Sequence, residues 1–196
     1  MILLAAIAAG LVTGLLLARW RGLPYQTPDL KHGWLVFIAF VPQLAAFYLP
    51  GSRQMVSGFW AAFLLPFSQA LLLLFAWLNR HLPGMLILLL GAALNFTVIA
   101  ANRGFMPISP QTASHLVPQA VLENIQPGER FGTKDILLLP QDTRFEWLAD
   151  RFLPPAWSAY QVAFSFGDVL IAIGTFRLLA FPGASQEGFY LRGKQI

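Results

Sequence analysis

Apolar residues fall in long blocks along most of this chain, and polar residues gather in the connections between the blocks. A block of about 20 apolar residues is long enough to cross the hydrocarbon core of a membrane as a helix. Blocks near this length cover residues 2–18, 33–49, 59–78, 85–101 and 158–181. The pattern predicts an all-α fold, a polytopic membrane helix bundle of about five spans.

The first block also carries a row of small residues, which are Ala6, Gly10, Gly14 and Ala18. They recur at every fourth position, so they share one face of a helix. Small residues let the backbone of another helix approach closely. The row predicts helix packing within this chain rather than between copies, and the alternative is a chance spacing in an alanine-rich span.

One long polar stretch, residues 102–157, separates the fourth block from the fifth and holds six of the nine acids. It is the part of the chain that is large enough to form structure outside the bilayer. We therefore divide the chain into spans one to four over residues 1–101, an extracytoplasmic cap over 102–157, and a fifth span with a cytoplasmic tail over 158–196.

The cap contains two amphipathic patterns and one short apolar run. Ser109, followed by a proline, fits the N-cap of a helix. Thr143 and Glu146 fit a capping box that would begin a second helix over residues 143–153. We expect two short helices lying on the outer membrane surface, with one short strand near residues 135–139 between them.

Composition favours the same class of protein. Of the 196 residues, 57% are hydrophobic and 11% are charged, whereas soluble domains carry about 25% charged residues. A water-soluble surface cannot be built from so few charges. The net charge of +4 includes no basic run or basic-aromatic patch, so we expect no nucleic-acid partner.

Basic residues favour one side of the predicted bundle. Seven of the thirteen fall on the side of the C-terminus: Arg19, Arg21, Lys31, Arg80, Arg177, Arg192 and Lys194. The short connection after the second block holds only Arg53, and the other five lie in the long polar stretch, where charge has less effect on topology. Cytoplasmic connections carry an excess of lysine and arginine. The count predicts a multi-pass protein of the cell inner (plasma) membrane, with the N-terminus outside and the C-terminus cytoplasmic.

Several kinds of chemistry have no support in the sequence. Cysteine is absent, and the three histidines have no second ligand at helical spacing. No phosphate-binding loop, dinucleotide glycine pattern or serine-nucleophile motif occurs. We therefore expect no metal and no cofactor.

An acid within the last block is the residue most suited to a special role. Asp168 would cost about 2.5–3.5 kcal/mol at the centre of a span. The predicted polar face comprises Gln161, Ser165, Asp168 and Thr175 on the fifth span, with Asn95 and Asn102 on the fourth. Asp168 is either a buried hydrogen-bonding hub, paired with Asn95, Asn102 or Arg103, or a group used in catalysis or proton-linked function.

Two motifs carry a family resemblance. They are NRGFMPIS at residues 102–109 and FSFGDVLIAIG at residues 164–174. In a small chain of five predicted spans, this pair resembles an uncharacterised bacterial family of polytopic membrane proteins known as a domain of unknown function. The resemblance implies no activity.

The second motif is also similar to the last motif of lipoprotein signal peptidase, a membrane-embedded aspartyl peptidase. This resemblance implies that Asp168 and Asp150 are two catalytic carboxylates. The sequence departs from the pattern, because Ser165 replaces the motif asparagine and the peptidase has four spans. In addition, a helix over residues 143–153 would turn Asp150 towards water, away from the bundle.

These observations favour a non-catalytic integral membrane subunit or scaffold, since no complete catalytic set is present. Its partners would be the lipid bilayer and other membrane protein subunits. One alternative is an aspartyl peptidase that uses Asp150 and Asp168, and a weaker one is a proton-linked transporter component.

Overall fold

The computed structural model describes residues 2–44, 57–158 and 161–182. The described part is mostly helical, and its longer helices are α1 (Ile2–Trp20), α2 (Trp34–Gln43), α4 (Gly58–Leu78), α5 (Met85–Ala101) and α8 (Phe166–Ala180). Within it, α1 with 19 residues and α4 with 21 are long and apolar enough to cross a membrane. The remaining predicted spans are shorter helices, and positions 45–49 of the second lie outside the described residues.

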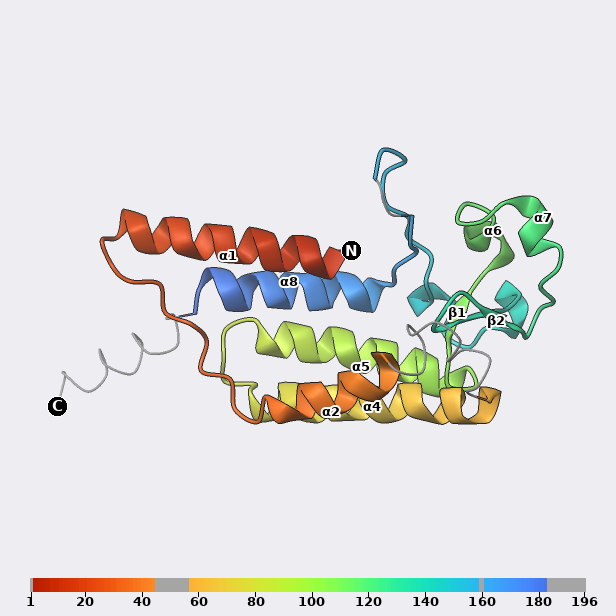
Figure 1. Ribbon diagram of the computed structural model, residues 1–196, viewed down its shortest axis with the longest axis horizontal. Helices are drawn as coiled ribbons and strands as arrows, with labels where there is room; N and C mark the ends of the chain where they lie inside the picture. The colour runs from red at the N-terminus through yellow and green to blue at the C-terminus, as the bar shows by residue number, and fades with distance from the viewer. Residues whose placement is uncertain (1, 45–56, 159–160, 183–196) are drawn as a thin grey trace.

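α1, α8, α5 and α4 lie side by side in a row, and α2 overlaps α4 in the view (Figure 1). Their contacts give the spatial order α1, α8, α5, α4, α2, so the last described helix, α8, lies between α1 and α5. Glycines permit the close contact of α1 with α8: a Cβ on Gly14 would lie 2.5 Å from the carbonyl oxygen of Leu179. Gly10 meets the same helix, so this face of α1 packs within the chain.

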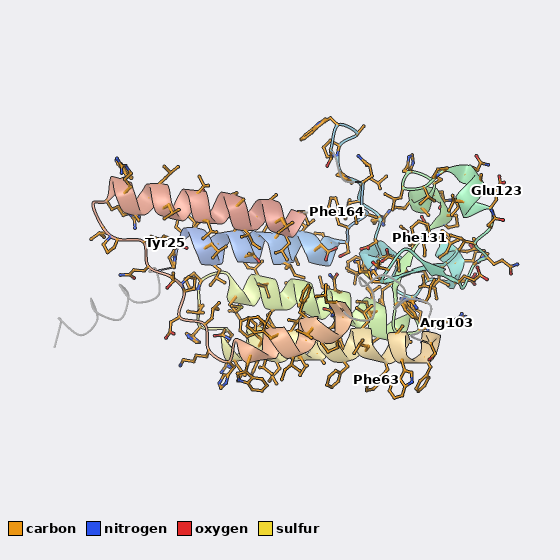
Figure 2. All side chains as sticks on the ribbon, in the orientation of Figure 1. Tyr25, Phe63, Arg103, Glu123, Phe131 and Phe164 are labelled. Carbon is orange, nitrogen blue, oxygen red and sulfur yellow. The ribbon has the colours of Figure 1, made fainter. Side chains whose placement is uncertain are left out.

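Ala6 and Ala18, the outer members of the predicted small-residue row, are half-buried in α1. The other faces of the helices are apolar and exposed. Phe63 points away from the row (Figure 2) and is 56% exposed. All six tryptophans are more than half exposed: Trp20, Trp34, Trp60, Trp77, Trp147 and Trp157. Large apolar side chains at these levels of exposure suit contact with lipid.

The cap covers the end of the row at which α1 begins (Figure 1). It is built on a three-stranded sheet in the order β1-β3-β2, with β1 (Met106–Ile108) parallel to β3 (Asp135–Leu137) and β2 (Arg130–Phe131) antiparallel to it. A hydrophobic cluster joins the sheet to α4 and α5 through Leu65, Val98, Met106 and Ile136. The cap therefore shares its core with the helices.

The first predicted cap helix is split in two. Ser109 is its N-cap, because its side chain accepts a hydrogen bond from the Thr112 amide at 3.2 Å. The helix ends after four residues, as α6 (Pro110–Ala113), and α7 (Gln119–Leu122) follows Pro118. Apolar residues of this segment pack on the sheet, so it belongs to the core of the cap.

The prediction of a second cap helix over residues 143–153 is wrong. One short 3₁₀ helix, Pro140–Asp142, ends just before this segment, and a second, Glu146–Leu148, covers three of its residues. Phe145 has a positive φ of 57°, which an α-helix does not allow. The Thr143 hydroxyl donates to the Leu139 carbonyl at 2.9 Å instead of capping a helix.

The fifth predicted span also begins later than expected. Ser165 is the N-cap of α8, which starts at Phe166 and has 15 residues. Gln161 therefore lies outside the helix, and its side chain donates to the carbonyls of Pro155 and Ser158. The tail residues 183–196, with Arg192 and Lys194, lie outside the described residues.

Candidate functional site

Asp168 lies in the first turn of α8, where the cap meets the helices. Its backbone amide donates to Ser165 Oγ at 3.0 Å, and Ser165 N donates to Asp168 Oδ2 at 3.1 Å. This reciprocal pair is a capping box, which satisfies two amides that a helix start leaves without partners. The negative charge also suits the positive end of the helix dipole.

Asn95 of α5 joins the capping box to the neighbouring helix. Its Nδ2 donates to Asp168 Oδ1 at 2.8 Å, and its Oδ1 accepts from Ser165 Oγ at 2.7 Å. A side chain on Gly167 would collide with the Asn95 amide, so glycine there is required for this approach. We call these contacts the Asn95–Ser165–Asp168 network. It gives each carboxylate oxygen of Asp168 a donor and ties α8 to α5.

A second polar group lies in the cap. Lys134 Nζ is 3.1 Å from Asp150 Oδ2 and 4.0 Å from Asp135 Oδ1. Asp150 is 1% exposed, and its backbone amide donates to the Pro107 carbonyl beside β1 at 3.2 Å. Asp150 therefore faces the interior of the cap. The prediction that it faces water is wrong, because that prediction assumed a helix over residues 143–153, which does not form.

The charges of the cap group affect one another. Burial raises the pKa of Asp150 to about 7, and Lys134 offsets only part of this effect. Burial likewise raises the pKa of Asp135 to about 6. Burial alone would lower the pKa of Lys134, but the charges of Asp150, Asp135 and Asp168 raise it overall. Asp168 is thus close enough to act on all three groups.

A cavity of about 900 Å³ extends from this junction between the helices. Its lining is mostly apolar and comes from the longer helices and from the cap. Lys134, Asn95 and Asp168 line it, whereas Asp150 does not. Thr175, one α8 position of the predicted polar face, also lines the cavity.

Asn102, one of the possible partners of Asp168, is the C-cap of α5 and bonds to the cap instead. Its Nδ2 donates to the carbonyls of Val98 and Arg144, and its Oδ1 accepts from the Arg144 amide at 3.0 Å. It therefore fastens the cap to the end of α5. The sequence pattern did not single out Lys134. The one feature that could have indicated its role is a lysine next to an aspartate in an acid-rich segment.

Among residues 2–44, 57–158 and 161–182, no three histidine, aspartate or glutamate side chains come together as possible metal ligands. The group around Lys134 instead combines one cation with several carboxylates, which suits proton sharing and hydrogen bonding. It offers a hydrogen-bond donor and acceptors at the polar end of an apolar cavity.

The chain belongs to DUF5317, a family of unknown function. The family model matches residues 27–180, which include the cap and four of the longer helices. The match confirms the resemblance of the two motifs to a family without assigned activity. Every residue of the Asn95–Ser165–Asp168 network and of the Lys134 group lies within the part matched to DUF5317. No curated protein and no solved structure matches the chain.

The raised pKa values predict a pH dependence of stability. A carboxyl group whose pKa is raised from 3.8 by folding stabilises the fold at low pH, and this contribution is lost as pH rises through the folded pKa. For Asp150 and Asp135 the loss spans about pH 4 to 7. The melting temperature in detergent should therefore be higher at pH 5 than at pH 8, by about 2–4 °C per kcal/mol lost.

The matched variant is Asp150→Asn, which keeps a hydrogen-bonding group beside Lys134 but cannot ionise. The variant should show a smaller difference in melting temperature between pH 5 and pH 8. Asp135 should account for the difference that remains. A melting temperature that rises from pH 5 to pH 8, or an unchanged difference in the variant, would contradict the assignment.

Proposed function

We propose that this member of DUF5317 is a non-catalytic integral membrane subunit or scaffold. In this proposal the five longer helices cross the cell inner membrane in alternation. The cap lies outside, and the chain beyond α8 lies in the cytoplasm. Its partners are the bilayer and other membrane protein subunits.

The direction of the chain supports this placement. The chain reverses between consecutive longer helices, and α1 begins at the cap end of the row while α8 ends at the opposite end (Figure 1). Five described basic residues lie close to helix ends at that opposite end: Arg19, Arg21, Lys31, Arg80 and Arg177. The cap holds five as well, but they are spread over a long segment, where basic residues have less effect on topology. A cytoplasmic excess of basic residues favours the same orientation.

The observation that carries the non-catalytic assignment is the use of both Asp168 oxygens in joining α8 to α5. They accept from Asn95 Nδ2 and Ser165 N, so the carboxylate is used in joining two helices. Asp150 is held by Lys134 and lies outside the cavity that Asp168 lines. A hydrolytic aspartate pair must hold one water between its members, which requires both to face the same space.

One observation favours the alternative of an aspartyl peptidase. Asp150 Oδ1 is buried without a hydrogen-bond partner among the described residues, and the pKa of Asp150 is raised to about 7. Perturbed and incompletely satisfied acids occur often at catalytic sites. The charge of Asp168 also raises the pKa of Asp150, so the two acids are electrostatically linked.

Substitutions at Asp168 separate the two functions. Asp168→Leu leaves Asn95 Nδ2 and Ser165 N without acceptors, at about 1–3 kcal/mol each, so the folded yield in detergent should fall. Asp168→Asn keeps one acceptor oxygen and should retain most of the yield. Asp142→Leu, at an exposed acid of the cap, is the control for loss of charge and should match the parent.

The same variants are assayed for cleavage of lipid-modified precursor proteins. We expect no cleavage by the parent protein. Cleavage by the parent that is abolished by both Asp150→Asn and Asp168→Asn would contradict the scaffold assignment and establish the peptidase.

The orientation has its own test, which the absence of cysteine makes direct. A cysteine introduced at Gln126 in the cap should react with a membrane-impermeant thiol reagent on intact cells. A cysteine at His81, in the turn between α4 and α5, should react only after the cells are opened. Both positions are exposed, so burial does not distinguish them. The reverse pattern would refute the proposed orientation.

A further inference from the structure

The cavity has the composition of a site for an amphiphile. Its volume of about 900 Å³ lies within the range of about 300–1,000 Å³ that is usual for ligand sites. Leu65, Leu72, Leu88 and Ile171 are among its apolar lining residues, and they come from α4, α5 and α8. Most of the wall thus suits a hydrocarbon chain, with few groups that hydrogen-bond.

The end of the cavity next to the cap presents both a donor and an acceptor. The Lys134 side chain lines the cavity and is 33% exposed. Within the described part of the chain, only the Asp150 carboxylate accepts a hydrogen bond from its ammonium. An ammonium has three donors, so donors remain for a ligand. Each oxygen of Asp168 accepts one hydrogen bond from Asn95 or Ser165, and a carboxylate oxygen has capacity for a second.

The donor of Lys134 and the acceptor of Asp168 together determine which headgroup the cavity can bind. A hydroxyl group can accept from Lys134 and donate to Asp168 at the same time. An anionic headgroup would lie against the Asp168 carboxylate, which lines the cavity. The charges of Asp150 and Asp135 nearby already act on the same lysine. A cationic headgroup would face the Lys134 ammonium directly. Like charges brought together in a site of low dielectric constant are costly.

We propose that this cavity binds one molecule of an uncharged, hydroxyl-headed lipid with a single hydrocarbon chain, such as a monoacylglycerol. Its head contacts Lys134 and Asp168, and its chain lies along α4, α5 and α8. Lipid enters between α1 and α2, the two ends of the helix row, since both line the cavity. Entry from the bilayer rests on the proposed membrane location.

The test is native mass spectrometry of the full chain in lauryldimethylamine oxide, a detergent without hydroxyl groups. The protein is incubated with equal concentrations of monooleoylglycerol, oleate and oleylamine, which share one hydrocarbon chain and differ in headgroup. We expect one bound monooleoylglycerol per protein, with about tenfold less of either charged amphiphile. No bound monooleoylglycerol, or equal binding of a charged amphiphile, would overturn the inference.

A matched pair of variants on α1 locates the binding site. Ala5 lines the cavity, whereas Ala9 lies one turn further along the same helix outside the lining, and both are exposed. Ala5→Trp should reduce bound monooleoylglycerol about tenfold, and Ala9→Trp should leave it unchanged. Leu72→Trp, on the α4 wall, should reduce it as well.

Each variant is compared with the parent by melting temperature, so that loss of binding is separated from loss of fold. Equal binding by the parent, Ala5→Trp and Leu72→Trp would overturn the inference, because the lipid would then lie on the outer surface. Cysteine labelling in cells reports the membrane location separately. A failure of that proposal is therefore distinguishable from a failure of lipid binding.

Discussion

The placement of α8 depends on the Asn95–Ser165–Asp168 network. α8 is the last helix among the described residues, yet it lies between α1 and α5, so contacts between segments distant in sequence hold it there. The network begins the helix through a capping box and ties that beginning to α5 through Asn95. Glycines on the two helices then allow close contact along their length, and Gly91 faces the backbone of Gly167.

The same interaction explains how an acid is accommodated in an apolar helix. Asp168 lies in the first turn next to the cap, where free amides and the helix dipole stabilise a carboxylate. The Lys134 group accommodates an acid inside the cap in a similar way, since the buried Asp150 carboxylate lies 3.1 Å from the partly exposed Lys134 ammonium. Removing Lys134 would leave Asp150 as an uncompensated buried group.

Much of the helical part could be predicted from the sequence, because long apolar blocks have few alternatives to helix. The bounds of α5 agree with the predicted block over residues 85–101. The start of α8 was predicted too early, because apolar residues continue through residues 158–165. The signal for the start is the spacing of Ser165 and Asp168, which form the capping box. Asn95 was correctly named as a possible partner of Asp168.

The cap was harder to predict because long-range contacts determine its structure. Nothing local indicates that Lys134 meets Asp150 or that Phe145 adopts a left-handed backbone. The capping-box pattern at Thr143 and Glu146 is also compatible with the turns that form there, because the hydrogen bonds of short polar side chains favour turns and helix starts alike. The local pattern at Thr143 therefore predicted the wrong element, whereas Ser109 begins a helix and the strand predicted near residues 135–139 forms as β3.

The central claim is that Asn95 and Asp168 stabilise the fold through each other. A double-mutant cycle with Asn95→Ala, Asp168→Ala and the double variant measures this coupling as a difference in free energy of unfolding in detergent. Our account predicts a coupling of about 1–3 kcal/mol, because the contact joins a charged acceptor to an amide donor at 2.8 Å. A coupling near zero, with the two single substitutions strictly additive, would contradict it.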